Sequence, residues 1–185
     1  MSAAPPKGKR RTAAAPRHAQ QVAACQGVDV RQRAMREDDL EQVLAIEQRA
    51  YSFPWTQGNF VDSLRAGYVA ELRVDAQDAV LGYFVAMPGV DEVHLLNLTV
   101  APPHQHQGHA RAMLEEVIAR AQALGASSLL LEVRLGNVRA QELYARRGFV
   151  EIGRRPRYYP AAHSAREDAR VMRLALGLTR APQTP

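Results

Sequence analysis

One segment of the chain combines the residue types of an anion-binding loop. An apolar run, Leu95–Val100, is followed by the loop Gln105–Arg111, which leads directly into an amphipathic stretch. Gly108 and the small Ala110 let backbone N–H groups approach an anion closely, and a helix that begins there adds positive potential. Arg111 adds a full charge. The segment predicts a pyrophosphate-binding loop, although it lacks the sequences typical of nucleoside triphosphatase loops and of dinucleotide folds.

Three histidines, His104, His106 and His109, raise the question of a metal site in this loop. Metal ligation requires imidazoles that converge, whereas a loop that wraps around a helix end turns its side chains outward. The nearby sequence also offers no cysteine or carboxylate to complete a tetrahedral set of ligands. We therefore expect no metal, and solvated histidines that are partly protonated over a phosphate.

Glu132 is a candidate general base, because it interrupts the apolar run Ser127–Val133. An ionised carboxylate on an apolar strand is costly to bury unless something uses it. Acceptance of a proton from a nucleophile is one such use. An ion pair with Arg134, or with another cation at the strand end, is the structural alternative, and this segment alone favours neither.

Asn137 and Tyr144 form a third candidate group. They are seven residues apart, nearly two helical turns, so on a helix they share one face. The phenol of Tyr144 could donate a proton, and Asn137 could cap the helix or hold an amide of a ligand. Considered alone, a tyrosine on a helix is more often a core residue than a catalytic one.

The apolar pattern predicts the elements that position these groups. The expected strands are Val28–Arg31, Tyr68–Val74, Val80–Met87, Glu92–Val100, Ser127–Val133, Phe149–Gly153 and Arg170–Leu176. Four helices are expected. The first begins at Asp38 or Asp39, and the second spans Thr56–Leu64. The third runs from the Gln105–Arg111 loop to Gly125, and the fourth lies between Asn137 and Gly148. This order predicts a mixed α/β fold, mainly antiparallel at first and with a βαβ unit behind.

Two of these elements have a distinctive pattern. The third helix carries a stripe of apolar residues at helical spacing, namely Ala110, Met113, Leu114, Val117, Ile118 and Ala121. The Ser127–Val133 run is nearly continuously apolar, as expected of a strand that parallel pairing buries on both faces. Between the last two strands we expect a polar loop that contains tyrosines.

Composition excludes several classes of protein. The 185 residues are 46% hydrophobic and 23% charged, which suits one globular domain. Apolar runs are far shorter than the roughly 18 residues of a membrane span. The single cysteine, Cys25, excludes a disulfide scaffold and suggests a reducing compartment, so we expect a cytoplasmic protein that does not bind a membrane.

The net charge of +5 belongs to the N-terminal segment. Five basic residues and no acidic residue lie in residues 1–28, whereas the rest of the chain has 19 of each. We expect residues 1–27 to be a disordered basic tail, 28–176 one domain, and 177–185 a flexible C-terminus. The tail could simply aid solubility, or it could bind nucleic acid or acidic lipid. A cleaved targeting segment is a further alternative, but the prolines of the tail oppose a targeting helix.

The order of these motifs resembles that of the GNAT superfamily of acetyl-CoA-dependent N-acetyltransferases. The resemblance covers about residues 28–176 and includes an Asn-Leu-Thr-Val strand, a Q-x-x-G-x-A loop, a Leu-Glu-Val-Arg strand, and then Asn137, Tyr144 and Gly148-Phe149. Within the superfamily, the chain resembles the bacterial ribosomal-protein alanine N-acetyltransferases. That narrower resemblance rests on peripheral segments, namely Ile46–Ala50, Phe53–Trp55, Tyr158–Pro160 and Glu167–Ala169.

The resemblance implies a mixed, mostly antiparallel sheet flanked by helices, with a βαβ cofactor-binding unit. It also implies acetyl transfer from acetyl-CoA, without a metal, to the α-amine of an N-terminal alanine of a ribosomal protein. Glu132 matches the general base of the family and Tyr144 its general acid. The positions that match its cofactor contacts are Leu98, Thr99, Val100, Gln105, His106, Gln107, Gly108, His109, Ala110, Arg111, Asn137 and Tyr144.

The sequence departs from the family pattern in its cofactor loop. His106 stands where the family often has a basic residue, and His109-Ala110 replaces a more usual apolar-Gly pair. Two other functions remain open. One is acetyl transfer to another protein or to a small amine. The other, of a different class, is a nucleic-acid-binding module that uses the basic tail, with weak RNA or ribosome association as its milder form.

Overall fold

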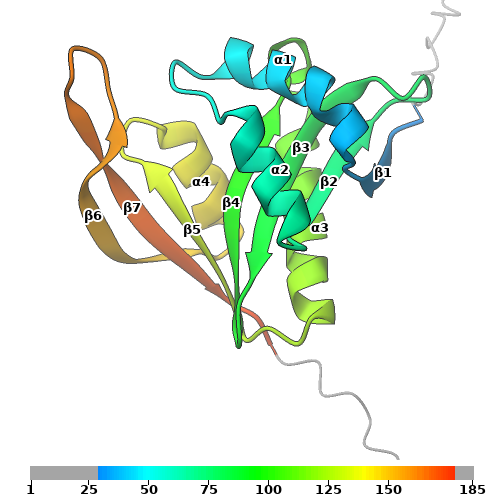
Figure 1. Cartoon of the computed structure of the whole chain (residues 1–185). Helices are drawn as coiled ribbons and strands as arrows, with labels where there is room; N and C mark the ends of the chain where they lie inside the picture. Colours follow the sequence, from blue (N-terminus) through cyan, green and yellow to red (C-terminus); the bar gives the residue numbers. More distant parts are fainter. Residues whose placement is uncertain (1–28, 178–185) are drawn as a thin grey trace, which may run out of the picture.

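The computed structural model describes residues 29–177, which form a seven-stranded sheet with helices on both faces (Figure 1). The strands are β1 (Arg31–Ala34), β2 (Val69–Val74), β3 (Val80–Pro88), β4 (Glu92–Val100), β5 (Ser128–Arg134), β6 (Val150–Pro160) and β7 (Arg166–Ala175). The α-helices are α1 (Leu40–Ala50), α2 (Gln57–Arg65), α3 (His109–Ala123) and α4 (Val138–Arg146). Short 3₁₀ turns, Glu37–Asp39 and Pro102–His104, precede α1 and α3.

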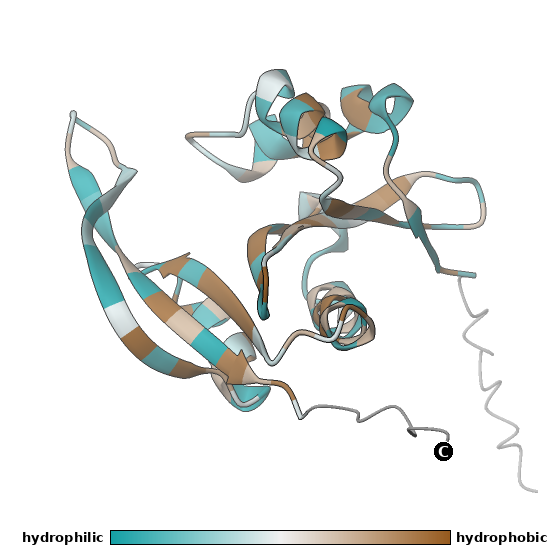
Figure 2. Ribbon diagram, turned by 60° about the horizontal axis from the view of Figure 1, so that its bottom comes forward, coloured by the Kyte–Doolittle hydropathy of each residue, from teal (hydrophilic) through white to brown (hydrophobic). Residues whose placement is uncertain are grey.

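Each face of the sheet has its own hydrophobic core. On one face, α1 and α2 pack on β1–β3 through buried side chains such as Val43, Phe60 and Leu72. On the other, α3 and α4 pack on β3–β5 through Met113, Leu114 and others. Figure 2 shows α1 and α2 above the sheet and α3 below it. This arrangement confirms the mixed, mostly antiparallel α/β fold.

The strand order is β1-β2-β3-β4-β5-β7-β6, and only the β4–β5 pair is parallel. The helix α3 connects these two strands, so β4-α3-β5 is the expected βαβ unit. Their pairing covers only Glu92–Leu95 and Ser128–Leu131. The register between β3 and β4 also shifts beyond Leu95, which leaves Leu96 as an extra residue in β4. From this bulge onward β4 turns away from β5, and the two strands separate (Figure 1).

The ends of α3 and α4 agree with the sequence pattern. Gly108 precedes α3 with a φ of +88°, and Gly125 follows it with a φ of +76°. These left-handed conformations favour glycine. The Asn137 side chain caps α4 by accepting a hydrogen bond from Ala140 N–H at 3.1 Å.

The last two strands differ from the expectation. The strand predicted as Phe149–Gly153 is β6, which continues to Pro160, and β7 already begins at Arg166. The stretch expected to be a polar loop is therefore mostly a β-hairpin. Its arginines and tyrosines hid the strand because the hairpin is largely exposed and lacks the apolar alternation of a half-buried strand.

Two smaller predictions were wrong. The first strand lies at Arg31–Ala34, three residues later than the expected start at Val28. The β5 strand is not buried on both faces, because only Leu129, Leu131 and Val133 are buried and the alternate residues are partly exposed. Its neighbours explain this difference, since β5 pairs in parallel with β4 but antiparallel with β7.

The expected basic tail, residues 1–27, and nearly all of the expected C-terminal segment, 177–185, lie outside the described residues. Within residues 29–177, no helix is both long and apolar enough to cross a membrane.

Candidate active site

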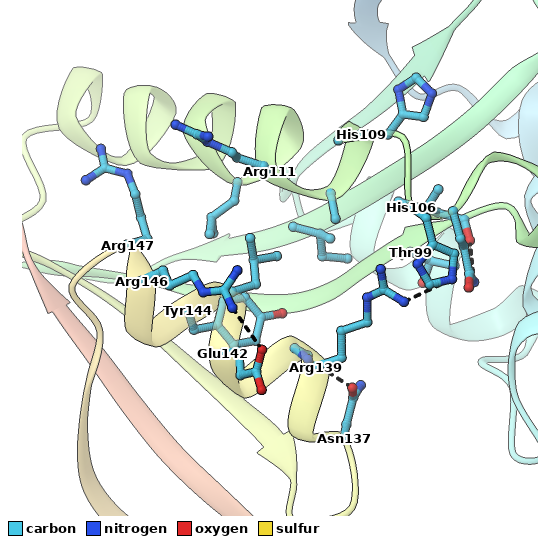
Figure 3. A pocket seen from close by; sticks show the side chains of 18 of the residues that line it. Thr99, His106, His109, Arg111, Asn137, Arg139, Glu142, Tyr144, Arg146 and Arg147 are labelled. Atoms are coloured by element: carbon cyan, nitrogen blue, oxygen red, sulfur yellow. Dashed lines mark hydrogen bonds and ion pairs between the residues drawn. The ribbon is translucent and has the colours of Figure 1, made fainter.

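A cleft of about 910 Å³ lies where β4 and β5 separate. Its walls come from the end of β4, the loop before α3, the first turn of α3, and α4 (Figure 3). Tyr51, which follows α1 on one face of the sheet, and Tyr144, which lies on α4 on the other face, both line it. The cleft therefore reaches through the gap between the two strands and joins the two faces.

The loop before α3 presents backbone donors to this cleft. The first helical hydrogen bond of α3 runs from Ala112 N–H to the Gly108 carbonyl at 3.1 Å. The amides of the first turn, His109, Ala110 and Arg111, precede that bond and remain available as donors. A Cβ added at Gly108 would meet nothing within 4 Å, so its positive φ, rather than lack of space, is what requires glycine.

Four arginines surround the same cleft. Arg111 lies on α3, and Arg139, Arg146 and Arg147 lie on α4 or directly after it. Arg139 lies 2.9 Å from the Nε2 of His106 across the cleft (Figure 3). Cations beside a helix N-terminus fit a ligand with several phosphate charges.

Sequence reasoning missed the three arginines near α4. One of them, Arg146, also forms an ion pair with Glu142, four residues before it, at 3.1 Å. The spacing of the arginines gave no signal of this cleft, because at about 100° per residue Arg139 and Arg146 lie on the side of the helix opposite Asn137 and Tyr144.

The loop histidines do not behave as one group. His109 turns away from the cleft centre toward β2, where its Nδ1 accepts a hydrogen bond from Arg73 Nε at 3.0 Å (Figure 3). Burial, together with the neighbouring Arg73 and His104, lowers the pKa of His109. This lowered pKa favours the neutral form of His109 in the described structure, and protonation of the loop histidines over a bound phosphate stays a prediction. Among residues 29–177, no group of three potential metal ligands occurs.

Tyr144 lies almost wholly buried at the inner end of the cleft (Figure 3). Its ring packs against Phe149, with 5.6 Å between the ring centroids. Burial raises the pKa of Tyr144 well above its usual value, and the nearby Tyr51 and Tyr159 raise it further. The phenol therefore keeps its proton across the whole physiological pH range and suits an acid rather than a base.

Glu132 lies on the opposite side of the same gap. Its neighbours on β5, Leu131 and Val133, are buried toward α3 and α4, so alternation turns Glu132 to the other face of the sheet. Glu132 is not among the residues that line the described cleft. Its side chain is 14% exposed, and its Oε1 lies 3.1 Å from Arg155 Nη2. The alternative pairing with Arg134 does not occur, because Arg134 pairs with Glu167 at 3.1 Å.

A buried hydrogen-bond network behind the cleft was not foreseen. Glu47 on α1 is 1% exposed and accepts hydrogen bonds from Tyr83 Oη and Asn97 Nδ2, both at 2.6 Å, and from Trp55 N–H at 3.0 Å. Thr99 Oγ1 donates to Asn97 Oδ1 at 2.7 Å. Thr99 Oγ1 also lies 2.8 Å from Tyr51 Oη. Because the threonine hydroxyl has already donated its one hydrogen, the tyrosine must donate in this second hydrogen bond.

This network ties the end of α1 to the part of β4 that follows the bulge. In the sequence, Glu47 was singled out only as part of the Ile46–Ala50 resemblance. A glutamate at a core position of an amphipathic helix was the available signal, because a buried carboxylate requires partners.

The structure brings most of the predicted site residues to one cleft. Those that line it are Leu98, Thr99, Val100, Gln105, His106, Gly108, His109, Ala110, Arg111, Asn137 and Tyr144. Gln107 does not line it, and its side-chain amide donates instead to the Pro103 carbonyl at 3.2 Å. Glu132 approaches the gap from the other face, as described above.

The sequence matches the acetyltransferase (GNAT) family over residues 38–149. A [ribosomal protein bS18]-alanine N-acetyltransferase from Haemophilus ducreyi is 39% identical over 140 residues, which cover 76% of this chain and 96% of that protein. The enzyme of the same name from Escherichia coli K12 is 35% identical over 140 residues, or 76% of this chain and 93% of that protein. The crystal structure of the ribosomal-protein-S18-alanine N-acetyltransferase from Escherichia coli superposes with a TM-score of 0.75 at 31% identity, covering 84% of this chain and 99% of that one.

Proposed function

Because the chain belongs to the GNAT acetyltransferase family, an acetyl-CoA-dependent group of N-acetyltransferases, we propose that it acetylates the α-amine of an N-terminal alanine on a ribosomal protein. Relatives that bear this activity in their names are 35–39% identical and match over nearly their whole length. The peripheral segments quoted above, such as Phe53–Trp55 and Tyr158–Pro160, support the same substrate.

The single observation that best supports acetyl transfer is the arrangement around the gap between β4 and β5. The cleft holds Tyr144 and the α3 N-terminus on one face of the sheet and reaches through the gap to the other face, to which Glu132 turns. A donor that enters from one face and an amine that enters from the other would meet at this gap. A single-substrate binding site does not need such a two-sided opening.

The residues of the cleft suit the chemistry of coenzyme A. The free amides of the α3 first turn and the surrounding arginines would hold its phosphates. The end of β4, Leu98–Val100, has no β5 partner in the described pairing, so its backbone can bond the amide groups of the ligand arm. When bound, acetyl-CoA supplies an activated acetyl group as a thioester.

Three groups of the chain would carry out the transfer. Glu132 accepts a proton from the substrate ammonium group, because only the neutral amine is a nucleophile. Backbone N–H groups at the separated end of β4 stabilise the oxyanion that forms on the acetyl carbonyl. Tyr144 donates its proton to the leaving sulfur, and its raised pKa ensures that this proton is present at neutral pH. No covalent intermediate on the protein is required.

An acetylation assay on short peptides that differ only in their first residue tests this proposal. We expect acetylation of the alanine peptide at its α-amine, located by mass spectrometry, and much slower reaction of peptides with a bulky or acidic first residue. A peptide with a blocked N-terminus and a free lysine, and a small polyamine, are the controls. Preferential acetylation of either control would favour the alternative, a lysine or small-amine acetyltransferase.

For the basic N-terminal segment we propose weak association with RNA of ribosomal particles. The support is its sequence alone, with Lys7, Lys9, Arg10, Arg11 and Arg17 and no acidic residue in residues 1–28. Deletion of residues 1–27 should leave acetylation of a short peptide intact and weaken salt-dependent binding to ribosomal particles. Unchanged binding after the deletion would assign the segment to solubility instead.

A further inference from the structure

Arg155 lies directly beside the carboxylate of Glu132. Its Nη2 lies 3.1 Å from Glu132 Oε1, and its guanidinium also lies over the Tyr158 ring, 5.4 Å from the centroid. The Glu132 side chain is 14% exposed, whereas that of Arg155 is 54% exposed. The carboxylate is thus fixed within the sheet, while the cation that pairs with it reaches in from solvent.

The register of the sheet explains how Arg155 reaches Glu132 across a whole strand. Glu132 pairs with Val171 of β7, which pairs with Gly153 of β6. Two residues further along, on the same face of the sheet, Ala169 of β7 pairs with Arg155 of β6. Arg155 therefore lies diagonally from Glu132, with β7 between them. Because Ala169 is small and Gly153 has no side chain, the long Arg155 side chain can cross β7 without obstruction.

The other cations nearby have partners of their own. Arg134 pairs with Glu167 and lies over the Tyr159 ring, 4.3 Å from the centroid. Arg154, next to Arg155 in the same strand, pairs with Glu151 at 2.8 Å. Among the described residues, Arg155 alone forms an ion pair with Glu132.

We propose that Arg155 is the counter-ion that the substrate's α-ammonium group displaces from Glu132. The proposal rests on the proposed function, because it assumes that Glu132 is the base. An ammonium group can replace the guanidinium without leaving the carboxylate unpaired. Because the guanidinium of this pair is half exposed and solvated, the pair contributes little stability, and a peptide can displace Arg155 at small expense in affinity.

The charge change in the reaction gives this exchange a direction. The substrate nitrogen loses two protons as the ammonium group becomes an amide. The first proton passes to Glu132. The second passes to Tyr144, which has given its own proton to the leaving sulfur. The acetylated product is neutral and no longer competes with a guanidinium for the carboxylate. Arg155 returns as Glu132 releases its proton to water, which restores the ionised base and disfavours rebinding of the product.

Binding of an alanine-starting peptide to the full chain saturated with CoA tests the proposal, because CoA without its acetyl group allows binding but no reaction. The peptide Kd is measured by calorimetry for the wild type, Arg155→Gln, Arg155→Lys and the matched control Arg154→Gln. We expect Arg155→Gln to lower the Kd about two- to fivefold, the size of an exposed ion pair. The Kd of Arg155→Lys should stay close to the wild-type value, and Arg154→Gln should leave the Kd unchanged.

The same Kd measurements in a Glu132→Gln background show whether Arg155 acts through its ion pair with Glu132. Without the carboxylate, Arg155 has nothing to pair with, so Arg155→Gln should no longer change the peptide Kd. A Kd that rises in Arg155→Gln would overturn the proposal, since Arg155 would then bind the peptide rather than compete with it. An unchanged Kd would also overturn it. Neither result touches the proposed function, which the assay on peptides with different first residues tests, or the role of Glu132 as the base, which fails if Glu132→Gln remains fully active in acetyl transfer.

Discussion

At the scale of single residues, Tyr144 and Glu132 have separate surroundings that suit opposite roles. Tyr144 is buried among apolar groups at the inner end of the cleft, and burial raises its pKa. Glu132 stands at the other side of the β4–β5 gap, beside an exposed cation. An acid that keeps its proton and a base that has access to solvent are the two groups that acetyl transfer to an amine requires.

Replacement of Tyr144 by phenylalanine tests the acid. Tyr144→Phe keeps the packing against Phe149 and removes only the hydroxyl, so the fold should persist. We expect kcat to fall by roughly 10²-fold or more, the usual contribution of one general acid. Because the raised pKa keeps the phenol protonated from pH 6 to 9, the size of the defect should not depend on pH in that range. A steady-state pH profile of both proteins provides the measurement, and a defect that disappears at high pH would contradict the assignment.

Replacement of Glu47 tests the buried network. Glu47→Gln keeps the volume of the side chain but weakens three hydrogen bonds to a buried carboxylate, so unfolding free energy should fall by about 1–3 kcal/mol. The weaker hydrogen bond between Glu47 and Asn97 should also disturb Asn97 and Thr99 at the end of β4, and kcat should fall as a result. Urea denaturation measures the first effect. Glu41→Gln, an exposed glutamate on the same helix, is the control, and equal stability of the two variants would contradict this role for Glu47.

At the scale of elements, the decisive feature is the junction of β4 with α3. The bulge in β4 ends its pairing with β5, and the loop then brings the α3 N-terminus to the opening. The glycine at the start of α3 keeps a left-handed conformation, which turns the chain from the loop into a helix whose first residues line the cleft. The phosphate binding that we propose for this element requires that no negative charge lies there.

Two substitutions at Gly108 separate charge from backbone strain. Gly108→Asp places a carboxylate beside the proposed phosphate position and should raise the Kd for acetyl-CoA at least about tenfold, roughly 1.4 kcal/mol. The asparagine of Gly108→Asn has nearly the same shape as the aspartate and tolerates the positive φ equally well, but it carries no charge. Calorimetry on both variants provides the comparison. Equal affinities for the two would show that phosphates do not bind at this loop.

At the scale of the whole molecule, the sequence predicted the fold more completely than the site. The strands β2–β4 and the helices α1–α4 follow apolar periods and end signals such as Asn137 and Gly125, and these local patterns were sufficient. The β6–β7 hairpin was largely missed because pairing with a neighbour, not burial, makes it a strand.

Site residues that act through long-range contacts were also hidden. The link from Glu47 to Asn97 joins residues 50 positions apart, and the contact of Arg155 with Glu132 depends on sheet register. Neither leaves a periodic pattern in the sequence. In contrast, Gly108 and the stripe that follows it were visible because one short segment builds the whole element.

The pH dependence of turnover in Glu132→Gln tests the central claim most directly. We expect kcat on an alanine-starting peptide to fall by roughly 10²–10⁴ near neutral pH, with little change in acetyl-CoA affinity, because Glu132 does not line the cofactor cleft. Part of the activity should return as pH rises toward 9, since an α-amine with a pKa near 8 then loses its proton without help. Glu92→Gln, at the far end of β4, should behave as the wild type. A Glu132→Gln enzyme with near-normal kcat and an unaltered pH profile would contradict the account, because Glu132 would then be a structural residue.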